Sequence, residues 1–333
     1  MKSNQLNFGI GFLQGDKLQK TIGIVKKAEE LGFTHCWIAE DYFYGGAFST
    51  ATACAVNTTK INIGIGVINP FTRHPALTAM EFGAFDLVAE GRGILGMGTS
   101  NKRWIEEQMG IPFIKPLKTL YESIQIIKKL FSNGEVEFSG NIFNTGKIKL
   151  GFKPYKKDIP FFLGLKGPKA LNLAGEIADG VLLSIMTSKD YVRYARKKIA
   201  EGAEESGRKP EDVKIAAYLV INISENRVKA REQVKPLIGK YLGIHGVHPI
   251  LTSSGMAEEE ILPFRKALLE GKDASNLVTD KLIDKFAIAG TKDECKEKII
   301  SIIEAGIDYP VAYEIPGVSL EDSMKNISKL FIK

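Results

Sequence analysis

The sequence has little cysteine, histidine or tryptophan, and this scarcity excludes several kinds of site. Among 333 residues there are 3 Cys, 4 His and 2 Trp. The cysteines, Cys36, Cys54 and Cys295, are odd in number and include no Cys-x-x-Cys pair, which argues against a disulfide framework and a thiolate metal site. Cys36 and Cys54 lie in apolar segments, so we expect both to be small core residues.

The sequence also lacks a long apolar run and a strong excess of one charge. No stretch approaches the roughly 18 apolar residues of a membrane span, and residues 1–5 lead into a strand without a signal-like segment. The 45 Lys and Arg exceed the 39 Asp and Glu by only 6, with no zinc-finger, RNP-like or basic-arm motif. We therefore expect a cytoplasmic protein that binds a small molecule, with no nucleic acid and no membrane as partner.

Short β-rich runs alternate regularly with segments of helical apolar spacing. In the first helical segment, Leu18, Ile22, Val25 and Ala28 recur at three- and four-residue steps, and Gly32 ends it. Such alternation predicts βαβ units and a parallel sheet. The eight β-rich runs are residues 7–12, 34–39, 61–68, 92–97, 160–165, 180–185, 213–223 and 307–313.

Eight such units predict an α/β fold, a (β/α)8 TIM barrel. The alternative is a doubly wound sheet, which predicts a glycine-rich dinucleotide turn after the first strand, and residues 9–15 lack that spacing. Two insertions interrupt the alternation: a small β excursion near 133–152 and a Gly- and Pro-punctuated, then helical, segment near 244–285. We expect a single domain over residues 1–333.

In such a barrel the chemistry belongs at the carboxyl ends of the strands. Glu40 and Asp41 follow the second strand, where a carboxylate can hydrogen-bond a heterocycle or move a proton; the alternative is a helix cap or a solvated pair. Residues 165–169 end a strand and open a helix, with Pro168 in the first turn. Backbone N–H groups, the helix dipole and two lysines there favour an anion, although surface lysines are common.

The histidines give weaker signals. His245 and His248 are three residues apart, but neighbouring glycines and a proline indicate a loop, and no third ligand is near, so we predict no metal site. His74 precedes Pro75, and we expect it to order the start of the third helix. Ser253 and Ser254 lie in a loop rather than at a nucleophile elbow, which argues against a hydrolase triad.

Several segments together resemble one enzyme family. They are 28–33 with 37–38, 63–76, 91–98, 167–168, 174–180 and 290–291. These segments resemble the luciferase-like flavin and deazaflavin oxidoreductases, and most closely the methylenetetrahydromethanopterin reductases that use coenzyme F420. The resemblance covers almost the whole chain.

The resemblance implies a deazaflavin ring at the mouth of the barrel and a hydride passed between its C5 and a small substrate, with a methylene-tetrahydropterin C1 carrier favoured and an alcohol or sugar phosphate left open. It also implies a non-prolyl cis peptide at Gly66-Val67 behind the ring, and at least a homodimer. Glu40 would hold the ring and Asp41 would be the substrate-facing acid. By family position, the cofactor contacts would be Glu40, Gly66, Val67, Asn69, Thr99, Ser100, Lys166, Gly167, Lys169 and Ala170.

Three positions depart from the family pattern. The methanopterin reductases have a glutamate at Gly11, relatives commonly have a histidine at Asp41, and an acid often stands at Asn101. Two other functions stay open. One is an FMN-dependent luciferase-like monooxygenase, whose phosphate Lys166 and Lys169 would hold equally well, although the lack of a histidine at position 41 argues against it. The other is a barrel that binds a flavin without catalysis, which the three altered positions favour. We also expect Lys102 and Arg103 to meet an anionic cofactor tail on electrostatic grounds.

Overall fold

The computed structural model describes residues 6–12 and 18–332. By their contacts these form two compact units. Of the described residues, unit 1 takes in 6–12, 30–34 and 165–332, and unit 2 takes in 18–29 and 35–164. The expectations for residues 1–5 and for the 13–15 part of the first turn lie outside the described residues, and the single-domain prediction stays a prediction.

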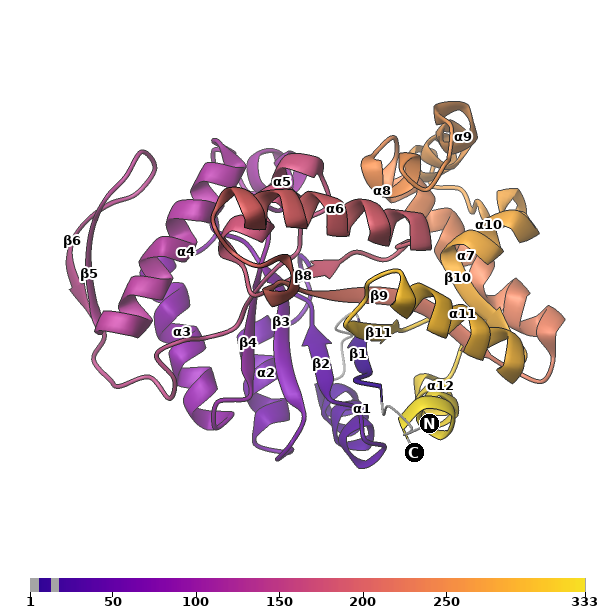
Figure 1. Cartoon of the computed structure of the whole chain (residues 1–333), viewed down its shortest axis with the longest axis horizontal. Helices are drawn as coiled ribbons and strands as arrows, with labels where there is room; N and C mark the ends of the chain where they lie inside the picture. Colours follow the sequence, from indigo (N-terminus) through magenta and orange to yellow (C-terminus); the bar gives the residue numbers. More distant parts are fainter. Residues whose placement is uncertain (1–5, 13–17, 333) are drawn as a thin grey trace. The chain divides into compact units, whose positions relative to one another are not determined.

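Unit 2 is built on four parallel strands in the order β2-β3-β4-β7. Because they are parallel, their carboxyl ends lie at one edge. The strands are β2 (His35–Ile38), β3 (Asn62–Ile68), β4 (Gly93–Met97) and β7 (Phe161–Leu163). The other elements are α1 (Leu18–Glu30), α2 (Ala47–Ala55), α3 (Pro75–Val88), a π-helix at Arg103–Gln108, α4 (Pro116–Asn133) and the hairpin β5 (Glu135–Ser139) and β6 (Asn144–Lys149), which lies beside α4 (Figure 1).

In unit 1 the long strand β9 is the centre of the parallel ladder. It pairs with β8, β10 and β11, and β11 pairs with β1. The strands are β1 (Gly9–Phe12), β8 (Gly180–Leu183), β9 (Lys214–Ile223), β10 (Ala287–Gly290) and β11 (Tyr309–Tyr313). The helices are α5 (Pro168–Ile177), α6 (Lys189–Glu205), α7 (Arg227–His245), α8 (Pro249–Thr252), α9 (Glu258–Leu269), α10 (Asp280–Phe286), α11 (Lys292–Glu304) and α12 (Leu320–Ile327), with short turns of 3-10 helix at Pro210–Asp212 and Ser275–Leu277 and a π-helix at Ser328–Ile332.

All eight predicted strands are present, which confirms the alternation of strand and helix. The insertion near 133–152 contains the expected hairpin, in which Glu135 pairs antiparallel with Lys149, and the insertion near 244–285 is mostly helical. The strand β10 was not predicted from the sequence. This strand, Ala287–Gly290, follows α10 without an intervening turn, so no turn residue separates it from the helical pattern.

The cores are apolar, as expected for strands covered by helices. Cys36, Cys54 and Cys295 are free and buried, which confirms Cys36 and Cys54 as core residues. Burial raises the pKa of the Cys54 thiol to about 12. Helix α1 buries Val25 and Ala28 as expected, whereas Leu18, at its first position, is 41% exposed.

Two glutamates in unit 2 each fix a loop by accepting several backbone hydrogen bonds. Glu29 accepts from the N–H groups of residues 59–61, and Glu122 accepts from those of residues 141–143. Burial alone would raise the pKa of both carboxyls, but these N–H donors lower it below the usual value. Glu29 thereby orders the entry to β3, and Glu122 orders the tip of the β5–β6 hairpin.

Arg92 joins the start of β4 to the segment between α2 and β3. Its guanidinium donates to the carbonyls of Ala55, Thr58 and Ile61 and to the hydroxyl of Thr58, at 3.0–3.1 Å. These carbonyls belong to residues that are buried. A buried acceptor that loses its donor costs free energy, so Arg92 is a stability determinant of unit 2.

We expect Arg92→Met to lower the free energy of unfolding by about 2–4 kcal/mol, because it leaves three carbonyls without this donor. Urea and thermal unfolding measure the loss. Arg103→Met makes the same chemical change at an exposed residue and should cost less than about 0.5 kcal/mol. Equal effects of the two substitutions would contradict this assignment.

Candidate functional site

The predicted site residues fall into two groups, each within one unit. In unit 2 they follow β2, β3 and β4, and in unit 1 they lie at the start of α5. The unit 2 group is Glu40, Asp41, Gly66, Val67, Asn69, Thr99 and Ser100, and the unit 1 group is Lys166, Gly167, Lys169 and Ala170.

Glu40 is held by Arg73, from the loop before α3. The two carboxylate oxygens lie 2.7 and 2.9 Å from the Arg73 Nη atoms, a bidentate pair, and the Glu40 side chain is only 11% exposed. Arg73 also contacts Glu81 at 3.2 Å and lies over the Phe48 ring. Glu40 is therefore fixed in position and orientation at the end of β2. The neighbouring Asp41 is partly buried.

Tyr42, which the sequence analysis did not select, lies in a polar network with Asn69. The Asn69 amide donates to the Tyr42 hydroxyl and to Thr72 Oγ1, and its oxygen accepts from the N–H groups of Phe71 and Thr72. Burial, and then the nearby Glu40 carboxylate, raises the pKa of Tyr42. All hydrogen-bonding positions of Asn69 are thus used to order the loop after β3, and its cofactor contact stays a prediction.

The Gly66-Val67 peptide bond is cis, as the family resemblance implies. The pairing of β3 with β4 shifts register between Ile65 and Ile68, so the bond lies in a bulge. A second non-prolyl cis bond, Tyr42-Phe43, lies in the loop after β2 and was not expected.

Glycines surround the Val67 side chain. A Cβ atom on Gly98 would lie 2.9 Å from a Val67 methyl, and one on Gly164 would lie 2.7 Å from the other. A Cβ on Gly96 would lie 1.9 Å from the Ile65 carbonyl oxygen. Since real Cβ contacts are longer, only glycine at these three positions lets β4 and β7 approach the bulge so closely.

The loop after β4 contains a strained residue with an unused hydroxyl. Ser100 has φ of 57°, in the left-handed region that non-glycine residues rarely adopt. Its Oγ is buried and makes no hydrogen bond of normal geometry to the described residues, although it is near enough to the Tyr42 hydroxyl to affect its pKa. Next to it, Asn101 accepts from the Trp104 N–H at 3.1 Å and so starts the following helical turn.

In unit 1, α5 begins as predicted, with Gly167 as the N-cap residue and Pro168 in the first turn. Gly167 has no side chain to cap the helix, and helix geometry leaves the first N–H groups, including those of Lys169 and Ala170, without an intrahelical partner. The Tyr191 hydroxyl donates to the Lys166 carbonyl at 2.9 Å and fixes the chain just before the helix.

The Lys166 ammonium contacts a histidine. Its Nζ lies 3.1 Å from His245 Nδ1, and His245 Nε2 lies 2.9 Å from the Ile185 carbonyl. Burial lowers the pKa of Lys166, and burial and then Lys166 lower the pKa of His245 to about 3. Burial and then Lys166 also lower the pKa of His248, to about 4.

The expectation that His245 lies in a loop was wrong, because it is the last residue of α7. The nearby Gly243 does not break the helix. It allows a close approach to α9, where a Cβ on Gly243 would lie 2.6 Å from the Phe264 carbonyl. His248 does lie beyond α7, as the N-cap residue of α8, and His74 caps α3 by accepting from the Ala76 N–H, as expected for His74.

The space at Gly11, near the end of β1, is filled by tyrosine. A Cβ on Gly11 would lie 2.2 Å from Cε1 of Tyr218 on β9. The Tyr218 ring packs edge-to-face on Tyr313, at 5.3 Å between centroids, and the Tyr313 hydroxyl lies 3.2 Å from that of Tyr241. The space that a side chain at position 11 would need is therefore occupied by the Tyr218 ring, which is itself packed against Tyr313.

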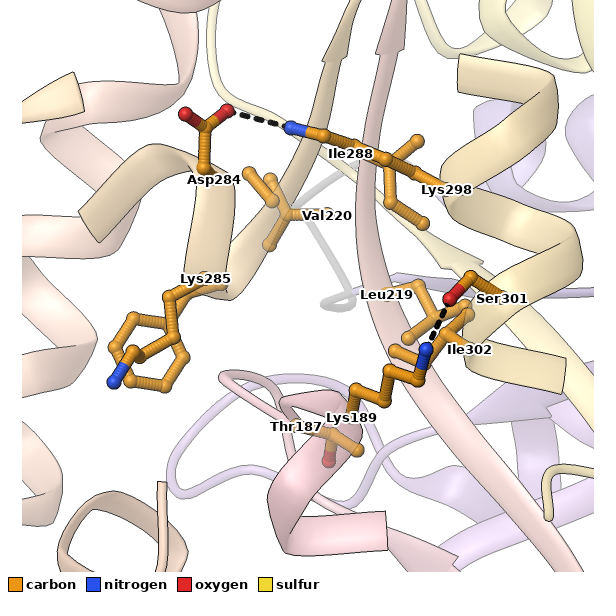
Figure 2. A pocket seen from close by; sticks show the side chains of 12 residues that line it. Thr187, Lys189, Leu219, Val220, Asp284, Lys285, Ile288, Lys298, Ser301 and Ile302 are labelled. Carbon is orange, nitrogen blue, oxygen red and sulfur yellow. Dashed lines mark hydrogen bonds and ion pairs between the residues drawn. The ribbon is translucent and has the colours of Figure 1, made fainter. Parts of the chain in front are cut away.

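One cavity of unit 1 is lined by none of the predicted residues. It has a volume of about 140 Å³ and lies between the β9–β10 strands and the helices α6, α10 and α11 (Figure 2). Its three lysines are bound to the protein: Lys189 contacts Ser301 at 2.5 Å, Lys298 contacts Asp284 at 2.6 Å, and Lys285 donates to the Ser254 carbonyl. We assign it a structural role.

Two further observations bear on the expected partners. Among residues 6–12 and 18–332, no three His, Cys, Asp or Glu side chains gather as a metal site requires. None of the helices in this described part is both long and apolar enough to cross a membrane.

Comparisons with known proteins identify relatives along the whole chain. Residues 6–309 match the family model for luciferase-like monooxygenases. The chain is 34% identical to the 5,10-methylenetetrahydromethanopterin reductase of Methanolobus tindarius, over 98% of this chain and 100% of that protein. It is 33% identical to the enzyme of the same name from Archaeoglobus fulgidus, over 98% and 99%.

The fold agrees with a solved relative. The structure of the coenzyme F420 dependent tetrahydromethanopterin reductase from Methanopyrus kandleri superposes with a TM-score of 0.90 at 31% identity, covering 98% of this chain and 99% of that one. The predicted fold class, an α/β TIM barrel, is thereby confirmed. With a family match over most of its length and relatives above 30% identity, the chain belongs to the luciferase-like family, alongside the 5,10-methylenetetrahydromethanopterin reductases.

Proposed function

We propose that the protein is an F420-dependent oxidoreductase that transfers a hydride between the deazaflavin C5 and a small substrate, a C1 carrier of the methylene-tetrahydropterin type. The observation that carries this proposal is the full-length similarity to relatives named 5,10-methylenetetrahydromethanopterin reductase. The Methanopyrus kandleri structure is named as coenzyme F420 dependent, which supports the same cofactor here.

The side chains at the strand ends fit such a cofactor. In unit 2, the bulge at Val67 presents an apolar side chain, and the buried Ser100 hydroxyl makes no hydrogen bond of normal geometry to the described residues. In unit 1, Lys166 and the uncapped start of α5 suit an anion. When bound, F420 supplies the hydride, and the protein supplies position and electrostatics.

Asp41 is our candidate for the group that moves a proton at the substrate. It directly follows Glu40 at the end of β2, and the family resemblance implies the substrate-facing acid at this position, whereas the Glu40 carboxylate is bound by Arg73. We assign Glu40 the role of holding the cofactor ring, because its orientation is fixed. A general acid or base typically contributes about 10²–10⁴-fold to a rate.

A second candidate is an FMN-dependent monooxygenase, which the description of the matched family favours. Lys166 and the start of α5 suit the phosphate of FMN as well as the anionic tail of F420. A flavin-binding barrel without catalysis is the third candidate. Cofactor preference separates the first two, and turnover separates both from the third.

We further propose that the protein assembles at least as a homodimer, through the outer face of α3. This helix is apolar on nearly all sides, and Leu77, Met80, Leu87 and Val88 on it are 41–52% exposed. A helix that is apolar all round is normally buried. A second copy of the chain would cover this stripe by pairing α3 with its equivalent, as a two-fold interface requires.

Cofactor preference tests the proposed function. Purified protein titrated separately with oxidised F420 and with FMN, followed by fluorescence, should bind F420 at least tenfold more tightly. The reverse preference, with oxygen consumption, would favour the monooxygenase. Binding of neither would refute the proposed function without touching the fold.

Replacement of Asp41 tests its role in proton transfer. Asp41→Asn should lower turnover with a methylene-tetrahydropterin by about 10²-fold or more, since Asn cannot move a proton, and should change the F420 dissociation constant less than about threefold. Asp158→Asn, at an exposed position, is the matched control and should change neither. Weakened cofactor binding with normal turnover would rule out this role.

The molecular mass in solution tests the proposed assembly through α3. Light scattering should give a mass near twice the 36.6 kDa of the chain, or a higher multiple. Met80→Glu places a charge in the apolar stripe and should shift the mass to that of a single chain. Val228→Glu, at a 69% exposed residue of α7, should leave assembly unchanged. A monomeric native protein, or an unaffected Met80→Glu variant, would contradict the α3 interface.

A further inference from the structure

Lys166 is a partly buried cation whose partner is neutral. Three other enclosed cations of this chain pair with carboxylates: Arg73 with Glu40, Arg231 with Asp280 and Asp284, and Arg196 with Asp308. Others, such as Arg92, Arg208 and Lys285, donate to backbone carbonyls. The Lys166 ammonium instead contacts His245 Nδ1 at 3.1 Å. Burial is the cause of its lowered pKa, and no carboxylate of the described residues raises it.

The hydrogen bonds fix the protonation state of His245. The Ile185 carbonyl can only accept, so His245 Nε2, 2.9 Å away, carries the hydrogen and donates. Nδ1 is then the unprotonated nitrogen, and its lone pair accepts from the Lys166 ammonium. The low pKa of His245, about 3, agrees with an imidazole that stays neutral.

A neutral acceptor and a carboxylate differ in how much of the positive charge of Lys166 stays available to a ligand. A carboxylate beside Lys166 would cancel most of its charge, whereas an imidazole fixes the ammonium and leaves its full positive charge available. The ammonium has three donors, of which His245 takes one. Lys166 directly precedes Gly167, where α5 starts without a side-chain cap, so the charge lies next to a helix N-terminus that also favours anions.

We propose that His245 is a positioning residue that holds Lys166 at the start of α5 without neutralising it, so that Lys166 binds a phosphate ester of the cofactor. The identity of that cofactor rests on the proposed function above. The titratable groups recorded near this pair are His248, which responds to the Lys166 charge, Tyr241, whose ring lies 6.1 Å from that of His245, and Tyr191, whose hydroxyl donates to the Lys166 carbonyl; none is a carboxylate.

An isosteric pair of substitutions tests the charge directly. His245→Asn places a neutral acceptor near the position of Nδ1, and His245→Asp places a negative charge there. We expect His245→Asn to bind F420 within about threefold of the native protein and His245→Asp to bind it about 30-fold or more weakly. A deazaflavin fragment without the phosphate should bind all three proteins alike.

Lys166→Met and His245→Asp form a double-mutant cycle. Lys166→Met should weaken F420 binding about as much as His245→Asp, and adding His245→Asp to it should cause little further loss, because the two act through one charge. Equal weakening by Asn and Asp, or no weakening by Asp, would overturn the proposal and leave His245 a structural role.

Two additional measurements distinguish a failure of the His245 role from a failure of the proposed function. If F420 does not bind, the proposed function fails, but titration with FMN and with inorganic phosphate still compares Asn with Asp at position 245. If His245→Asp does not fold, ¹⁵N NMR of the native protein decides: a neutral His245 with hydrogen on Nε2 between pH 5 and 8 is expected. A protonated imidazolium at pH 6 would overturn the proposal.

Discussion

Parallel strand pairing is the constraint on which the chemistry of this chain depends. In a parallel ladder every strand runs the same way, so the residues that follow the strands lie at one edge, whatever their distance in sequence. In unit 2 this brings Glu40 after β2, Asn69 after β3 and Ser100 after β4 to the same edge. The contacts of Tyr42 with Asn69, and of Arg73 with Glu40, are its direct result.

Strand pairing alone does not explain how closely the backbone of β4 and β7 approaches the bulge in β3. Glycine residues allow this approach. Gly96, Gly98 and Gly164 have no Cβ atom, and this lets β4 and β7 pack against the bulge at Val67. The bulge shifts the register between β3 and β4, so that the residues after β3 leave the sheet at a different angle from a regular strand.

How much the sequence predicts depends on whether a feature is local. The eight strands and the start of α5 follow from apolar runs and from Pro168, which act within a few residues. The fourteen-residue α3 and its histidine cap are local in the same sense. The cis bond at Gly66-Val67 was expected only from the family resemblance, since no local rule places it there.

The features that the sequence did not predict depend on distant partners. His245 lies 79 positions from Lys166, and Gly243 suggests a break in α7 until the close contact with α9 explains it. Tyr42 is next to a selected residue, but its hydroxyl is bound by Asn69, which is 27 positions away. Such pairings are set by tertiary packing, which periodicity and turn residues do not encode.

The three departures from the family pattern have different physical consequences. At Gly11 the missing side chain is replaced in space by Tyr218, so a larger residue could not return there unless this ring moved. At Asn101 the side chain accepts from the Trp104 N–H and starts a helical turn, a role that an aspartate also fills. At Asp41 a carboxylate stands where the family resemblance implies a histidine, so under the proposed function the group that moves the proton would be an acid rather than an imidazole.

Two polar groups, Ser100 in unit 2 and Lys166 in unit 1, are arranged as the proposed ligand binding would require. Ser100 combines a left-handed backbone with a buried hydroxyl that has no normal hydrogen bond to the described residues, and each costs free energy. Lys166 keeps a partly buried charge beside a neutral histidine rather than a carboxylate. A polar ligand group would satisfy the Ser100 hydroxyl in unit 2, and an anionic group would satisfy Lys166 in unit 1, whereas a purely structural role gains nothing from either arrangement.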